Sequence, residues 1–272
     1  CPEAIFIRPR FELYRQISLQ IREIFSRYTS VLEPVSLDEA YLDVSNNDKQ
    51  LKAVRIAWDI QQAIYKELKL TGSAGVGPNK LLAKIASDLK KPFGIVVILP
   101  ERVREFMGQL PLRKIPGIGG VSEKKLKDHG LYLCKDVWTL TPARASELGF
   151  SENYYNWLVE RAQGIDTSEL KTTRQRKSFG KEITLTEDSL DSVFLENHLS
   201  KLLESIFASH KDEVKSAKTL NIKIKYFDFV QVTRSHTKAD GIGELSSAVK
   251  IACSLLKNTL VGQKKIRLIG AS

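Results

Sequence analysis

The sequence predicts a multidomain α+β protein, because helix and strand patterns are distributed unevenly along its 272 residues. Both patterns occur in residues 1–98, only helical patterns occur in residues 99–166, and both return in residues 177–272. A chain of this length can bury the cores of two or three domains. Its 42% hydrophobic and 27% charged residues are typical of an ordered globular protein.

Residues 1–98 are predicted to form one sheet covered by helices, a two-layer α+β arrangement. Apolar residues at helical spacing predict the helices, and alternation or a short apolar run predicts the strands. The predicted helices are Phe11–Tyr28, Leu51–Leu68 and Asn79–Leu89, and the predicted strands are Ala40–Val44, Thr71–Val76 and Gly94–Leu99. The longest purely apolar run, Ile95–Leu99, is too short to cross a bilayer, so no membrane partner is expected.

Two adjacent carboxylates, Asp38 and Glu39, lie where the strand Ala40–Val44 begins, after the turn-prone pair Glu33-Pro34. Neighbouring carboxylates repel each other unless a cation lies between them or both reach water. At the start of a strand both can converge on one divalent ion, and Mg²⁺ takes such oxygen ligands while leaving positions open for phosphates. Two such ions can activate a 3′-hydroxyl and stabilise a departing pyrophosphate. A solvated acidic turn is the alternative.

Residues 99–166 are predicted to form a small helical domain. The predicted helices are Glu101–Gln109, Ser122–His129, Cys134–Leu140, Ala143–Leu148 and Glu152–Gln163. Pro116-Gly117-Ile118-Gly119 resembles the hairpin of a helix-hairpin-helix motif, in which glycines let backbone N–H groups approach a phosphate. Lys124 lies on the helix that follows, so the hairpin predicts a contact to a nucleic-acid backbone without base specificity. A plain Gly-rich turn is the alternative.

Basic charge is concentrated in the last third of the chain. The net charge is +10, and residues 167–272 contain 18 basic and 12 acidic residues, which is more than half of the excess. Residues 167–176 predict a flexible polar linker, and Lys171–Lys177 carries four basic residues and no acidic one. A localised basic excess favours binding to a polyanion, and a merely soluble basic surface is the alternative.

Residues 177–272 are predicted to form a sheet with one face covered by helices. The predicted order is strand Ser178–Thr186, helix Leu190–His210, strand Thr219–Thr233, helix Glu244–Leu260 and strand Lys264–Gly270. Alternation in the long strand places Leu220, Ile222, Ile224 and Tyr226 on one face and Asn221, Lys223 and Lys225 on the other. The cationic face suits the edge of a duplex groove, and lysines that prevent sheet aggregation are the alternative.

Taken together, these segments resemble one known family, the Y-family or translesion DNA polymerases, over essentially the whole chain. The motifs that carry the resemblance are Ile21–Thr29, Ser36–Val44, Leu82–Asp88, Lys91-Pro92, Ile115–Gly119 and Arg176–Ser178. The resemblance implies template-directed, low-fidelity DNA synthesis in DNA damage tolerance, with transfer of dNTPs onto a primer 3′ end. It also implies a right-hand polymerase with a palm at residues 1–98, a helical thumb at 99–166, a basic linker at 167–176 and a little-finger DNA-binding domain at 177–272.

The resemblance implies roles for individual residues. Asp38 and Glu39 match catalytic carboxylates that bind two Mg²⁺ ions, with Asp38 shared by both. Lys91 matches the palm lysine that holds the triphosphate of the incoming dNTP, whereas Lys84 reads as an ordinary helix lysine. The candidate contacts to primer-template DNA are Gly117, Gly119, Lys124, Lys223 and Lys225. The full-length protein is expected to be a cytoplasmic bacterial enzyme with a sliding clamp as a further partner.

The chain departs from the family pattern at both ends and at one residue of the helical domain. It begins at Cys1 without an initiator Met, so we expect a piece of a longer protein in which another metal-binding Asp, a steric gate and the fingers precede Cys1. A final strand and a clamp-binding tail are expected beyond Ser272. Gly120 stands where many members have a basic residue. The chain as written is expected to bind DNA better than it polymerises.

Two other functions fit part of the pattern. A non-catalytic DNA-binding fragment needs only the hairpin and the basic last domain. A metal-dependent nuclease would use Asp38 and Glu39 but leaves Lys91 and the resemblance of the whole chain unexplained.

Overall fold

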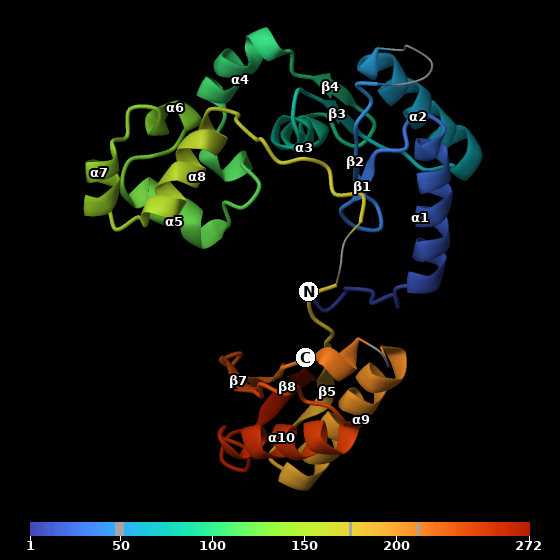
Figure 1. The fold of residues 1–272 in the computed structure, drawn as a ribbon, viewed down its shortest axis with the longest axis vertical. Helices are drawn as coiled ribbons and strands as arrows, with labels where there is room; N and C mark the ends of the chain where they lie inside the picture. The colour runs from blue at the N-terminus through green and yellow to red at the C-terminus, as the bar shows by residue number, and fades with distance from the viewer. Residues whose placement is uncertain (47–51, 174–175, 211–212) are drawn as a thin grey trace. The chain divides into compact units, whose positions relative to one another are not determined.

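A computed structural model describes residues 1–46, 52–173, 176–210 and 213–272, which belong to two compact units (Figure 1). Unit 1 comprises residues 1–174 and unit 2 comprises residues 175–272. Each unit has its own hydrophobic core. Leu51, the predicted start of a helix, and Arg174 of the predicted basic linker lie outside the described residues.

The first part of unit 1 combines three helices with two small sheets. Its elements are α1 (Phe11–Ser26), β1 (Leu32–Pro34), β2 (Ala40–Leu42), α2 (Ala53–Leu68), β3 (Ala74–Val76), α3 (Lys80–Leu89) and β4 (Ile95–Val97). β1 and β2 form an antiparallel hairpin, β3 and β4 are parallel, and α3 packs against this second pair (Figure 1).

Two sequence expectations for this part are wrong. The described strands of this part form two separate sheets and not one. The prediction failed because alternation predicts a strand without specifying its partner. Glu33-Pro34 was expected to be a turn, yet both residues belong to β1, where Glu33 pairs with Tyr41. Pro34 ends this short strand, a position at which the missing N–H of a proline is tolerated.

The second part of unit 1 is helical, as predicted. Its elements are η1 (Pro100–Arg102), α4 (Val103–Gln109), η2 (Leu112–Lys114), α5 (Gly120–Asp128), α6 (Cys134–Val137), α7 (Pro142–Glu147) and α8 (Glu152–Ala162). One core joins it to α3, since Leu82 and Ile85 of α3 belong to the same buried cluster as Met107, Ile118 and Leu158. The helical part and α3 are therefore one packed body.

Unit 2 is a four-stranded antiparallel sheet with two helices on one face (Figure 1). Its elements are β5 (Lys181–Ser189), α9 (Ser192–Ser209), η3 (Val214–Ser216), β6 (Thr219–Tyr226), β7 (Gln231–Thr237), α10 (Leu245–Lys257) and β8 (Ile266–Ala271). The strand order is β5-β8-β6-β7. The predicted inward residues of β6 are all buried in the core of this unit: Leu220, Ile222, Ile224 and Tyr226.

The long strand predicted at Thr219–Thr233 is instead a hairpin of β6 and β7. Phe229 has a left-handed backbone with φ of 65°, and the carboxylate of Asp228 accepts a hydrogen bond from the N–H of Val230 at 3.3 Å. The N–H of Tyr226 donates to the carbonyl of Val230 at 2.9 Å and closes the turn. The prediction failed because the run between the two strands lacks glycine and proline, the usual marks of a turn.

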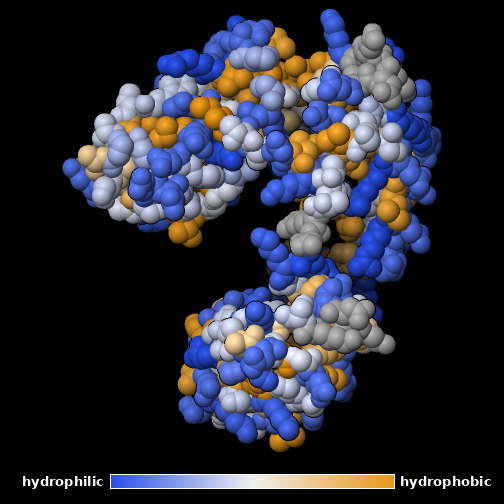
Figure 2. Space-filling view, viewed as in Figure 1, coloured by the Kyte–Doolittle hydropathy of each residue, from blue (hydrophilic) through white to orange (hydrophobic). Residues whose placement is uncertain are grey.

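No helix among the described residues is both long and apolar enough to cross a membrane. On the face seen in Figure 2, hydrophilic side chains cover most of the surface of each unit, and smaller apolar patches are scattered among these side chains.

Candidate functional site

The carboxylate turn, residues 35–39, connects β1 to β2 and presents Asp38 and Glu39 side by side. The hydroxyl of Ser36 donates a hydrogen bond to Oδ1 of Asp38 at 2.6 Å, and Oγ of Ser36 accepts from the N–H of Glu39 at 3.1 Å. The N–H of Val35 donates to the carbonyl of Glu39 at 2.9 Å. Asp38 is exposed and Glu39 is half-buried, so both carboxylates are accessible from the surface on a constrained turn.

Two lysines of α3 face the β1–β2 hairpin. Lys84 forms an ion pair with Glu39, and Nζ of Lys80 pairs with Glu33 at 2.6 Å. Residues four apart lie on one face of a helix, which explains how both lysines reach the same hairpin. Sequence reasoning treated Lys84 as an ordinary helix lysine and so missed this contact with a site residue. The available signal was two lysines one helical turn apart on α3 and two glutamates in the β1–β2 hairpin, Glu33 on β1 and Glu39 at the end of the turn.

Lys91 lies just beyond the end of α3, and the peptide bond that joins it to Pro92 is cis. Its Nζ pairs with Asp88 at 2.8 Å. The pKa of Lys91 is raised, first by its hydrogen bond from Nζ to Asp88, with further contributions from the charges of Asp88, Glu39 and Asp38. The lysine therefore lies within electrostatic range of the carboxylate turn, and it stays protonated at neutral pH.

The donor set fits Mg²⁺ in part. Asp38 and Glu39 supply carboxylate oxygens on one turn, and Mg²⁺ is commonly bound by one or two carboxylates together with water and substrate phosphates. Among the described residues, no group of three or more His, Cys, Asp or Glu side chains is arranged to hold a metal ion. The described residues would therefore hold the metal through these two carboxylates, with Lys84 displaced from Glu39.

The predicted hairpin precedes α5. Gly117 has φ of 103°, a left-handed conformation that favours glycine, and a Cβ added there would lie 3.0 Å from the ring of Trp157. Gly119 is the N-cap of α5, and neither Gly119 nor Gly120 has atoms near the place of a Cβ. The first N–H groups of a helix have no partner within the helix, so this open N-terminus can accept a phosphate.

The three lysines chosen from sequence as DNA contacts all lie at the surface, but two of them have acidic partners. The side chain of Lys124 on α5 is 80% exposed and pairs with Asp128 at 3.2 Å. Lys223 of β6 pairs with Glu182 of β5 at 2.7 Å. β8 runs between these two strands, and its residue in register with both is Gly270, so no side chain separates the two charges. The outer face of the sheet is thus less cationic than its lysines alone indicate.

Family models match the chain in three segments. The impB/mucB/samB family matches residues 1–88, the helix-hairpin-helix motif of that family matches residues 100–131, and its C-terminal domain matches residues 176–272. DNA polymerase IV of Clostridioides difficile is 42% identical over 274 residues, a match that covers 100% of this chain and 74% of that protein. DNA polymerase IV of Listeria welshimeri is 41% identical and is covered to 76%. This chain belongs to the Y-family of DNA polymerases.

Solved structures agree with this assignment. A Y-family DNA polymerase chimera, Dbh-Dpo4(243-245)-Dbh, matches with a TM-score of 0.86 at 28% identity, covering 99% of this chain and 78% of the chimera. An insertion ternary complex of Dbh DNA polymerase matches with a TM-score of 0.62 at 27% identity, covering 99% of this chain. The family and the α+β fold class predicted from the sequence are confirmed, whereas the domain boundaries at residues 98, 166 and 176 stay predictions.

Proposed function

We propose that the carboxylate turn is the catalytic metal site of this Y-family polymerase and that Lys91 binds the triphosphate of the incoming dNTP. Family membership supports a DNA-directed DNA polymerase, a nucleotidyltransferase that acts in translesion synthesis. The alternative of a non-catalytic DNA-binding fragment is not favoured, because the relatives that match 99–100% of this chain are named DNA polymerase IV.

The observation that carries the proposal is the pair of carboxylates on the Ser36 turn. Divalent-metal dependence follows from the family; the finer proposal is that two Mg²⁺ ions bind, with Asp38 shared and one further Asp supplied by the segment expected before Cys1. Such ions lower the pKa of an attacking hydroxyl and neutralise the charge of a leaving pyrophosphate. Ser36 holds Asp38 by its hydroxyl, and the backbone of the turn fixes Glu39. Asp38 is therefore oriented before a metal arrives, whereas the carboxylate of Glu39 has to leave Lys84 to bind one.

Lys91 is proposed to anchor the triphosphate. A lysine suits a phosphate as a compact point charge with three donors. Its position beyond the last turn of α3, within range of Asp38 and Glu39, supports a nucleotide bound between the lysine and the metal site. Asp88 pairs with the ammonium group of Lys91 at 2.8 Å.

Primer-template DNA is proposed to contact both units through its backbone. The N-terminus of α5, with Gly117 and Gly119 before it and Lys124 after it, supports a phosphate contact. In unit 2, Lys223 and Lys225 on the outer face of β6 supply further cations. Contacts of this kind position the duplex and carry no base information. A DNA substrate and bacterial relatives also support a cytoplasmic enzyme, and the sliding clamp stays a proposal for the full-length protein.

Single-nucleotide incorporation tests the proposed function. The full-length protein is incubated with a primer-template and each dNTP in turn, on four templates that differ only in the first unpaired base. We expect the primer to be extended by the complementary dNTP in preference to the others, in the presence of Mg²⁺ and not in excess EDTA. Extension that ignores the template base, or that persists in EDTA, would contradict template-directed, metal-dependent synthesis.

A further inference from the structure

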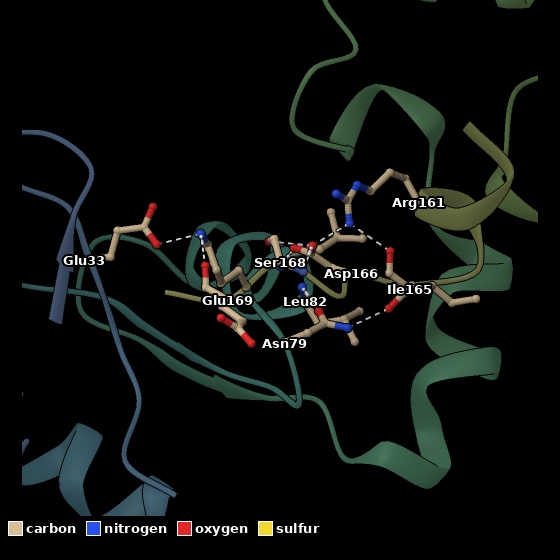
Figure 3. A network of polar contacts seen from close by, with 11 residues as sticks. Glu33, Asn79, Leu82, Arg161, Ile165, Asp166, Ser168 and Glu169 are labelled. Carbon is tan, nitrogen blue, oxygen red and sulfur yellow. Dashed lines mark hydrogen bonds and ion pairs between the residues drawn. The ribbon is translucent and has the colours of Figure 1, made fainter. Parts of the chain in front are cut away.

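The segment that follows α8 stays packed on unit 1, because Asp166 in this segment contacts both α3 and α8 (Figure 3). The carboxylate of Asp166 accepts a hydrogen bond from the N–H of Leu81, in the first turn of α3, at 3.1 Å, and pairs with Arg161 of α8 at 2.8 Å. The Asp166 side chain is 7% exposed. A carboxylate at the N-terminus of a helix is stabilised by the unpaired N–H groups there.

Glu33 of β1 contacts the same segment at Lys171, five residues after Asp166. Its carboxylate accepts a hydrogen bond from the N–H of Lys171 at 2.9 Å and pairs with Nζ of Lys80 at 2.6 Å. Nζ of Lys80 also donates to the carbonyl of Glu169 at 3.4 Å. The Glu33 and Lys80 side chains are only 18% and 15% exposed. This contact is therefore partly shielded from solvent, unlike an ordinary surface ion pair.

The first half of the predicted flexible linker is thus held on unit 1. Residues 167–176 were expected to be a flexible tether because they are polar, but the partners of this segment lie far away in the sequence, on β1 and α3. At the other end, the guanidinium of Arg176 makes an exposed contact with the ring of His210 at 3.3 Å, and Phe179 is the first described residue that packs against the core of unit 2. The connection between the fixed points Lys171 and Phe179 is eight residues long.

We propose that Glu33 is a positioning residue for DNA binding, because it shortens the connection that joins unit 2 to unit 1. The proposal rests on the proposed contact of unit 2 with DNA. Eight residues span at most about 28 Å. Without Glu33, Lys80 loses the ion pair that directs it toward the carbonyl of Glu169, so the next fixed point is Asp166, and the thirteen residues from Asp166 to Phe179 span up to about 45 Å. When one unit is bound to DNA, the effective concentration of the other falls roughly as the −3/2 power of the connection length or more steeply. Loss of the Glu33 contact should therefore weaken DNA binding at least about twofold.

Glu33→Ala and Glu33→Gln in the full chain test the contact itself. The alanine variant loses both partners, whereas the glutamine variant keeps an oxygen that can accept from the N–H of Lys171. We expect faster hydrogen exchange at the Lys171 amide in Glu33→Ala and partial protection in Glu33→Gln. Glu67→Ala is the matched control, because it breaks the Arg27–Glu67 pair without touching the segment. Unchanged exchange at Lys171 in Glu33→Ala would overturn the anchoring role.

DNA affinity tests whether a longer connection weakens binding. An insertion serves as the control, because it lengthens the connection and leaves the contacts of Glu33 and Asp166 intact. Five Gly/Ser residues inserted between Thr172 and Thr173 lengthen the connection from eight to thirteen residues. We expect Glu33→Ala and the insertion to weaken primer-template binding by a similar factor of at least about two, with Glu67→Ala unchanged. Weaker binding in the insertion alone would overturn the role of Glu33. Unchanged binding in both would overturn the length effect, and a Lys223→Ala, Lys225→Ala double variant in the same assay then shows whether the unit 2 contact has failed as well.

Discussion

Lys84 of α3 forms an ion pair with Glu39, the second carboxylate of the carboxylate turn. The ammonium group therefore neutralises a proposed metal ligand before a metal ion binds. Because Lys84 is held on a helix whose opposite face is buried, its stem cannot move far from the turn. The pair links the turn to α3. If the turn binds metal as proposed, Lys84 competes with the divalent cation for the Glu39 carboxylate.

Replacement of Lys84 tests this competition. We expect Lys84→Gln to lower the Mg²⁺ concentration that gives half-maximal primer extension by about two- to tenfold, since a like charge near the ions is removed. Affinity for primer-template DNA should stay unchanged. A Mg²⁺ titration of extension rates provides the measurement, with Lys135→Gln on α6 as the control. A raised Mg²⁺ requirement in Lys84→Gln would mean that the lysine assists the metal and does not compete with it.

The adjacent lysines at the end of α3 allow a matched comparison. We expect Lys91→Ala to raise KM for the incoming dNTP about tenfold or more, because a charge-assisted phosphate contact contributes more than about 1.5 kcal/mol. Lys90→Ala should have a smaller effect, since only Lys91 is proposed to contact the triphosphate. Steady-state incorporation kinetics of both variants measure the difference. Equal increases in KM for Lys91→Ala and Lys90→Ala would contradict a specific role of Lys91.

The glycines of the hairpin before α5 should differ in their tolerance of a side chain. Gly117→Ala places a Cβ on a residue with φ of 103° and 3.0 Å from Trp157, so we expect a loss of about 1–3 kcal/mol in stability and weaker DNA binding. Gly120→Ala is the control, because it lies in the first turn of α5 with open space around it. Denaturant unfolding and DNA titrations measure both effects. An equally stable Gly117→Ala variant would contradict the hairpin geometry.

Asp166 should make a pH-dependent contribution to stability. Burial alone would raise its pKa, but hydrogen bonds from Ser168 and Arg161 outweigh burial and hold the pKa below its usual value. A carboxylate with a lowered native pKa stabilises the fold above its unfolded pKa of about 3.9, and this stabilisation disappears as the pH falls through the native pKa. We expect Asp166→Asn to be less stable than the wild type at pH 7 and the difference to shrink below about pH 4. Urea unfolding across this range measures it, and a constant difference would refute the assignment.

Local sequence patterns predicted most elements but not the contacts between them. The helix predicted at Asn79–Leu89 begins with a capping residue, because the side chain of Asn79 accepts a hydrogen bond from the N–H of Leu82 at 3.0 Å, and such a cap depends only on residues three apart. The contacts of Lys84 with Glu39 and of Glu33 with Lys171 join residues 45 and 138 positions apart, so no local pattern contains them. The neutralisation of Lys223 was missed for the same reason, since it depends on the register of three strands.

The sequence predicted the part of the candidate site that is formed by residues adjacent in the chain. Asp38 and Glu39 are adjacent, and the alternation after them marks the strand that follows, so the sequence itself places the two carboxylates together. The hydroxyl of Ser36 that holds Asp38 lies only two residues away and was within reach of the same reasoning. By contrast, the approach of α3 to the turn is a matter of tertiary packing, and propensity carries no information about it.

Single-turnover primer extension by Asp38→Ala tests the central proposal most directly, when it is measured in the full-length protein beside duplex affinity. Loss of one ligand of a two-metal site removes a transition-state interaction and leaves the backbone contacts intact. We expect the extension rate to fall at least about 1000-fold while the Kd for primer-template DNA stays within about threefold of the wild type. Asp59→Ala on α2, where Asp59 pairs with Arg55, is the control and should extend normally. Wild-type extension by Asp38→Ala would contradict a catalytic metal site at the carboxylate turn.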